Sequence, residues 1–244
     1  MMLFSSIGFR PSRLTFPAAA MIACLCAAAA SQQPNEAAVI RGVDTAVKSR
    51  VDAIECYTVT EHYAVYRGSD QAHPAAEMTV KTAYKRETGK SYTILTESGS
   101  AMLQRLVLNS ILENEKRINE PGVREGAWLT SANYQMKLKP GRPERVNGHD
   151  CFVLSITPRQ KAPNLIVGTL WVDTRDESIV QIQGTASKSI SVFTGATQLM
   201  RQYSPVAGFA EATRARAVSS SFLFGQTVVT IDYSGYEIDI RATR

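Results

Sequence analysis

The chain has 244 residues, a length that usually makes one domain and that can bury ~70% of the unfolded surface. Its formal net charge of +5 is spread along the sequence and is too diffuse to indicate nucleic-acid binding. No HxxxH, HExxH or CxxC spacing occurs, so the sequence indicates neither a metal site nor a cofactor.

The first thirty residues have the pattern of an export signal. Arg10 and Arg13 form a basic start, and an uncharged, alanine-rich stretch follows up to Ala30, with small residues at the cleavage position. That stretch is short and weakly hydrophobic for a transmembrane helix. We therefore expect residues 1–30 to be cleaved, and residues 31–244 to form a single periplasmic domain whose charge is +3 without the two arginines.

Two cysteines, Cys56 and Cys151, remain after that cleavage. In an oxidising compartment a disulfide is the default expectation for such a pair, and strand parity turns both thiols away from the apolar side. Two separate free thiols are the alternative, since the distance between them cannot be read from the sequence. A third cysteine, Cys24, ends a segment that loosely resembles a lipid-attachment motif, and a lipid anchor there is the second choice for processing.

The first predicted elements are a helix and a three-stranded meander. Asn35 can cap a helix that begins at Glu36, whose apolar side repeats every four residues for about five turns. Three segments of strict two-residue alternation follow, which is typical of antiparallel strands with one buried face. These strands are expected over roughly 56–66, 76–86 and 91–97.

The second half of the chain predicts one more helix and a long run of strands. Ser100 can cap a helix with an apolar stripe, formed by Leu103, Leu106, Val107 and Ile111. Alternation then returns over 134–138, 152–156 and 168–184, and three or more strands are expected between Thr197 and Ile240. About ten strands and two or three helices without a βαβ order predict an α+β fold with an antiparallel sheet.

Several patterns with catalytic or binding residue types are better explained by structure. Gly89-Lys90-Ser91 resembles the end of a phosphate-binding loop but joins two strands, so we interpret it as a hairpin turn. His149-Asp150-Cys151 has the residue types of a nucleophilic triad, yet neighbours on a strand point to opposite faces. Glu61 shares the apolar parity of its strand, where a bulge or a rim position near water is preferred to a catalytic acid. Core or rim packing is likewise preferred to a ligand contact for Trp128 and Trp171.

Two linked segments carry a family resemblance. Gly168–Asp173 (GTLWVD) and, after a turn, Ile179–Gly184 (IVQIQG) follow the turn and strand of Asn147–Leu154. This pattern and the order of elements over about residues 36–240 resemble the LolA/LolB-like superfamily of outer-membrane lipoprotein carriers. The chain departs from many relatives at Gly208–Ala212 (GFAEA), where they carry a bulky segment with proline. The resemblance implies a strongly curved, incomplete β-barrel with helices over its concave face.

The resemblance also implies a function. The expected protein is an exported monomeric carrier that binds acyl chains of lipoproteins or lipids in a hydrophobic cavity, with no catalysis and with a membrane-anchored donor or acceptor protein. An RseB-like sensor of envelope stress is the alternative with the same fold, and an envelope hydrolase is a third choice, which the missing G-x-S-x-G motif disfavours.

The apolar faces nominate the residues that would line such a cavity. Methionine and aliphatic side chains suit an adaptable pocket for an irregular guest. The competing interpretation is that the same side chains pack on the helices and leave no pocket. The nominated residues are Tyr63, Val65, Met78, Val80, Tyr84, Tyr92, Ile94, Leu103, Val107, Met136 and Leu138.

Overall fold

The computed structural model describes residues 35–162, 165–188, 197–221 and 225–241. Backbone contacts divide the chain into two units, residues 1–32 and residues 33–244, and every described residue belongs to the second. The expected signal peptide, with Cys24, lies outside the described residues.

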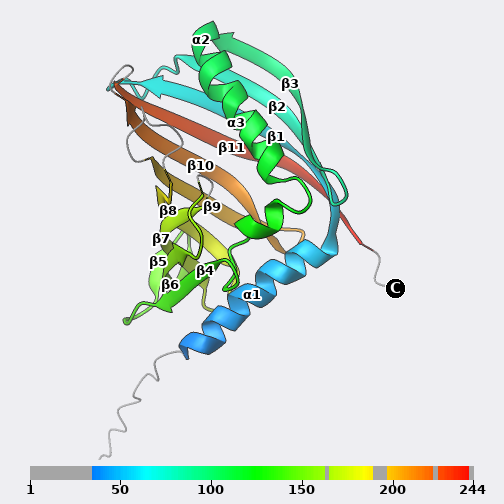
Figure 1. Ribbon diagram of the computed structural model, residues 1–244, viewed down its shortest axis with the longest axis vertical. Coiled ribbons are helices and arrows are strands. Elements are labelled where there is room, and N and C mark those ends of the chain that lie inside the picture. Colours follow the sequence, from blue (N-terminus) through cyan, green and yellow to red (C-terminus); the bar gives the residue numbers. More distant parts are fainter. Residues whose placement is uncertain (1–34, 163–164, 189–196, 222–224, 242–244) are drawn as a thin grey trace, which may run out of the picture. The chain divides into compact units, whose positions relative to one another are not determined.

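A single antiparallel sheet dominates the described part of the chain. Its strands follow the order β3-β2-β1-β11-β10-β9-β8-β7-β6-β4, and β5 pairs with β6 beside β4. The sheet curves strongly and its outermost strands β3 and β4 do not pair, so the barrel stays open (Figure 1). This confirms the predicted α+β class, with eleven strands instead of about ten. They are β1 (Ile54–Arg67), β2 (Ala76–Lys85), β3 (Gly89–Gly99), β4 (Tyr134–Leu138), β5 (Glu144–Val146), β6 (His149–Pro158), β7 (Ile166–Asp173), β8 (Ile179–Ala186), β9 (Gln198–Val206), β10 (Phe209–Ser221) and β11 (Gly225–Ile240).

Two helical segments lie over the sheet (Figure 1). The first, α1 (Glu36–Ala53), is capped as predicted, because the Asn35 side chain accepts a hydrogen bond from the Ala38 N–H. It runs directly into β1. The second is continuous from Ser100 to Asn119 and consists of α2 (Ala101–Leu103), the π-helical η1 (Gln104–Leu108) and α3 (Asn109–Ile118). A short 3₁₀ turn, η2 (Arg124–Ala127), leads from it to β4.

Each helical segment closes a separate hydrophobic core. Under α2–α3, side chains of the helix pack on inward-facing residues of β1, β2, β10 and β11, with Leu108 and Met78 almost fully buried. Under α1, Val39 and Val43 pack on β4, β6, β7 and β8. The middle of the concave face lies between these two cores.

The π turn changes which side of the second helix is buried. Leu103, Leu108 and Leu112 face the sheet, whereas Leu106 is 51% exposed, so the predicted stripe is wrong at that position. A π turn holds one more residue than an α turn, which explains the five-residue step from Leu103 to Leu108. Buried Gln104 ties this turn to the sheet by donating to the carbonyls of Glu77 and Ser98.

The expected disulfide between Cys56 and Cys151 is absent, and both are free thiols. Cys56 lies on β1 and Cys151 on β6, and five strands separate them in the sheet. Neighbouring strands are ~4.8 Å apart, so a disulfide, whose Cα atoms lie within ~7 Å, cannot span that separation along the sheet. The Cys56 thiol donates instead to Asp239.

Two glycines of the family-like hairpin allow close packing of β7 and β8. Gly168 and Gly184 pair across the hairpin, and a Cβ on Gly168 would lie 2.1 Å from the carbonyl oxygen of Gln183. We predict that Gly168→Ala lowers the free energy of unfolding by about 1–3 kcal/mol, because backbone atoms would have to move. Gly126→Ala is the control, since a Cβ there meets open space. Urea unfolding of both variants checks this, and equal stabilities would contradict it.

Candidate functional site

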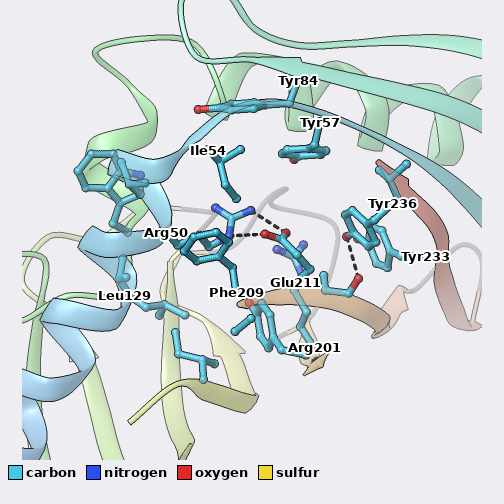
Figure 2. Close-up of a pocket in the computed structure, with 18 of the residues that line it drawn as sticks. Arg50, Ile54, Tyr57, Tyr84, Leu129, Arg201, Phe209, Glu211, Tyr233 and Tyr236 are labelled. Atoms are coloured by element: carbon cyan, nitrogen blue, oxygen red, sulfur yellow. Dashed lines mark hydrogen bonds and ion pairs between the residues drawn. The ribbon is translucent and has the colours of Figure 1, made fainter. Parts of the chain in front are cut away.

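A cavity of about 440 Å³ lies in the middle of the concave face, between the two cores (Figure 2). The second half of α1 forms one wall, and inward-facing residues of β1 and β11 form another. The end of α3, the η2 segment, the beginning of β10 and one or two residues each of β2, β3, β8 and β9 also contribute to the lining.

Aromatic and aliphatic side chains make up much of this lining. Tyr57 and Tyr84 stack with ring centroids 5.0 Å apart, and Tyr236 lies 6.0 Å from Tyr57 in a tilted arrangement. Ile54 and Phe209 lie close to this aromatic group, as Figure 2 shows. This part of the cavity offers an apolar, rigid surface to a guest.

A partly buried ion pair crosses the cavity from α1 to β10. Nε and one terminal nitrogen of Arg50 each donate to a different carboxylate oxygen of Glu211, and the donor–acceptor distance is 2.7 Å in both hydrogen bonds (Figure 2). Glu211 is only 3% exposed. Burial alone would lower the pKa of Arg50, but the hydrogen bond and the charge of Glu211 raise it above its usual range. The pair therefore stays ionised and fixes the end of α1 over the sheet.

The turn before β10 places Glu211. Ala207 and Gly208 both have positive φ angles, 50° and 85°, and join β9 to β10 in a two-residue hairpin. Such turns favour glycine because it adopts positive φ without steric cost. The turn starts β10 at Phe209, so that the GFAEA segment, the place where the sequence departs from the family pattern, lines the cavity along its whole length.

A second charged group lies near β3 and β9. Glu115 of α3 pairs with Lys90 at 3.1 Å and with Arg201 at 3.5 Å. Burial would raise the pKa of Glu115, but the two cations lower it to about 2. Burial would lower the pKa of Lys90, yet Glu115 raises it well above the usual value. The three groups remain charged at neutral pH.

Glu61 adds a carboxylate to the same part of the cavity. It is 3% exposed and accepts a hydrogen bond from the hydroxyl of Tyr63. The prediction of a bulge or a rim position near water is therefore wrong, because Glu61 pairs in regular register on both sides and β1 turns its carboxylate into the cavity beside Lys90. Burial and the negative charge of Glu61 raise the pKa of Tyr63, which keeps the phenol protonated as the donor.

The structure brings one of the nominated lining residues, Tyr84, to this cavity. Nine of the other ten lie in or next to the two cores. Tyr63, Val65, Met78, Val80 and Leu103 are buried under α2–α3, with Tyr92 and Val107 packed against them, and Met136 and Leu138 pack in the core under α1. Ile94 is 41% exposed on the outermost strand β3.

The charged lining residues were not nominated from the sequence. Glu61 stands out in the sequence as an acid at an apolar position of a strand. Lys90 stands out only as part of a motif that resembles the end of a phosphate-binding loop. Arg50, Glu115 and Arg201 carry no local signal, because each is an ordinary charged residue of a helix or strand until the fold shows what it faces. Trp128, for which core or rim packing was preferred, also lines the cavity.

The triad-like residues do not form a nucleophilic site. His149 Nδ1 lies 2.6 Å from one carboxylate oxygen of Asp173. The Arg175 side chain donates one hydrogen bond to each of the two Asp173 carboxylate oxygens. The hydrogen bonds from Arg175 hold the pKa of Asp173 well below its usual range. The Cys151 thiol donates only to the backbone carbonyl of His149, and burial raises its pKa to about 11. Across the described residues no group of three His, Cys, Asp or Glu side chains could hold a metal ion.

No family model matches the chain, and no curated protein matches it. Among solved structures, it is similar to a LolA superfamily protein from Nitrosomonas europaea (12% identity, 85% of this chain and 94% of that chain, TM-score 0.44). It is also similar to a domain described as an outer membrane lipoprotein-sorting protein from Vibrio parahaemolyticus (12%, 84% and 95%, TM-score 0.47). A third is a DUF1329 family protein from Desulfovibrio piger (16%, 84% and 95%, TM-score 0.43).

Those similarities concern the fold, and no functional residue is transferred from them. Within the described residues, the helices are too short or too polar to span a membrane.

The Arg50–Glu211 pair generates a stability prediction. Arg50→Met leaves the Glu211 carboxylate buried without a cation, so the free energy of unfolding should fall by about 3 kcal/mol or more. The double variant Arg50→Met, Glu211→Leu removes both charges and should recover most of that loss. Lys48→Met, in the exposed pair with Asp52, is the control and should change stability little. Equal stabilities of the single and double variants would contradict this.

The low pKa of Glu115 generates a pH prediction. Its pKa of about 2 lies below the usual 4.5, so the stabilisation is complete above pH 4.5 and is lost as the pH falls towards 2. In the natural protein, the free energy of unfolding should fall by on the order of 2–3 kcal/mol over this pH range because of Glu115. The Glu115→Gln variant should lack this decrease. Urea unfolding at a series of pH values measures this, and an unchanged acid slope would refute the ion-pair assignment.

Proposed function

We propose that this protein is an exported periplasmic carrier that holds a lipid, or the acyl chains of a lipoprotein, without changing them chemically. The observation that carries the proposal is the cavity of about 440 Å³, which joins an aromatic and aliphatic wall to a charged floor. Its volume is within the ~300–1,000 Å³ typical of small-molecule sites.

The two parts of the lining match the two parts of an amphipathic guest. Hydrocarbon contacts Ile54, Tyr57 and Phe209, and each buried methylene contributes ~0.8 kcal/mol. An ester, hydroxyl or head group lies towards Lys90 and Arg201, where hydrogen-bond donors are available. A purely apolar guest would exclude water from those donors of Lys90 and Arg201 that Glu115 does not accept, which costs free energy.

A carrier role also fits the arrangement of the polar groups. The described lining residues include no histidine and no cysteine, the side chains that most often act as base or thiol nucleophile. Glu115 and Glu211 are each held by cations, and Glu61 accepts from a tyrosine hydroxyl. These carboxylates are committed to structure, so binding without covalent chemistry is the function that the geometry supports best.

A cavity-filling variant tests the proposal. Ala210, at the beginning of β10, lines the cavity, and Ala210→Trp should occupy much of it and lower the affinity for a fluorescent fatty acid at least about tenfold. Ala72→Trp, in the exposed connection between β1 and β2, is the matched control and should bind like the natural protein. Circular dichroism establishes that both variants are folded.

Extraction of the natural protein supplies the second measurement. Protein purified from its native envelope should release lipid into organic solvent, in an amount that Ala210→Trp reduces. Absence of extractable lipid together with no uptake of the fluorescent fatty acid would overturn the proposal.

A further inference from the structure

The outer edge of the sheet at β3 has features of a protein interface. β3 is eleven residues long and outermost, so one row of its backbone N–H and C=O groups has no strand partner in the described part of the chain. Ile94 and Leu95 are 41% and 55% exposed. At the opposite edge, β4 has five residues, and its Leu138 N–H already donates to Glu36 of α1.

A bulge sets which residues of β3 share a face. Thr79 of β2 pairs with Thr96 and the next residue, Val80, pairs with Ile94, so Leu95 is an extra residue in β3. Residues 92, 94 and 97 pair with inward-facing positions of β2, whereas residues 91, 93, 96 and 98 pair with its outward-facing positions. On both sides of the Ile94–Leu95 peptide bond, inward-facing and outward-facing residues therefore follow in the same order.

The sequence is symmetric about the same peptide bond. Residues 91–98 read Ser-Tyr-Thr-Ile-Leu-Thr-Glu-Ser. In an antiparallel pairing of two copies centred there, Ile94 lies opposite Leu95, Thr93 opposite Thr96 and Tyr92 opposite Glu97 of the other copy. Tyr92 and Glu97 share the inward face and Thr93 and Thr96 share the outward face, so a hydroxyl lies beside a carboxylate and threonine beside threonine, while the apolar Ile94 and Leu95 meet at the bulge. Such cross-strand pairs stabilise a sheet, and none joins like charges.

We propose that the protein forms a two-fold symmetric homodimer by antiparallel pairing of β3 with β3 of a second copy. A two-fold interface requires a surface that is complementary to itself, which the symmetric strand provides. The proposal is independent of the ligand and departs from the monomer that the family resemblance implies.

The helix next to β3 extends the interface. Tyr92 donates to Glu113, and Gln104 donates to the Ser98 carbonyl, so α2–α3 runs along the strand. Its Met102 and Leu106 are 42% and 51% exposed. These side chains add apolar surface on the concave side of the paired strands, where burial stabilises association.

Sedimentation equilibrium of the purified protein is the first test. We expect a dimer whose dissociation constant rises at least about tenfold in Leu95→Arg. Val167→Arg, at an apolar residue of β7 that is also 41% exposed, is the matched control and should leave the dimer unchanged. A monomer at all concentrations, or a dimer that Leu95→Arg leaves intact, would overturn the proposal.

Disulfide trapping tests the register. In a Cys56→Ser background, Thr93→Cys and Thr96→Cys should cross-link when the two variants are mixed and less well when each is alone, because residue 93 faces residue 96 of the partner copy. Equal cross-linking in the single-variant samples would overturn the proposed register.

Discussion

The pairing of buried charges in the middle of the concave face is the constraint on which the cavity depends. A charged side chain inside a protein must be neutralised by a partner or remain in contact with water. Arg50 and Glu211 span the space between α1 and β10, and Lys90, Glu115 and Arg201 form a second group. The charged groups lie among the residues that line the space between the two cores, and this space remains a cavity of about 440 Å³.

The two helical segments divide the concave face into parts with different roles. Under α2–α3 and under α1, side chains fill the space and supply the hydrophobic stabilisation of the domain. Between them, stacked tyrosines and ion pairs hold fixed positions around a hollow. A rigid site of this kind loses little conformational freedom when a guest binds. Strands and helices both supply residues of the site, and the helices determine which part of the sheet remains accessible.

Much of the fold could be predicted from the sequence, because alternation along a strand is a local property. The capped helix at Glu36 followed from a local pattern of the same kind, and the meander and the positions of the later strands along the chain followed from alternation. The π turn at Gln104 could not be predicted, because an added residue in a turn depends on the sheet beneath it. Pairing of Cys56 with Cys151 was wrong for a related reason: parity indicates the direction of a thiol but not the strand order.

The site was less accessible to prediction than the fold. Apolar residues on an inward face are equally compatible with a filled core and with a binding pocket, and most of the nominated residues proved to be core. The better signals were exceptions to the pattern, Glu61 on an apolar face and Glu211 in the GFAEA segment. Arg50 and Arg201 are recognised only when the strand order brings β9 and β10 opposite α1.

The location of the guest is the central claim, and NMR of the tyrosine and methionine side chains tests it most directly. On titration with palmitate, ring signals of Tyr57, Tyr84 and Tyr236 should shift in a saturable manner, while the methyl signal of Met78, in the core under α2–α3, should not. Saturable shifts confined to Met78, with unchanged tyrosine signals, would contradict the account, since the guest would then enter the core and not the cavity.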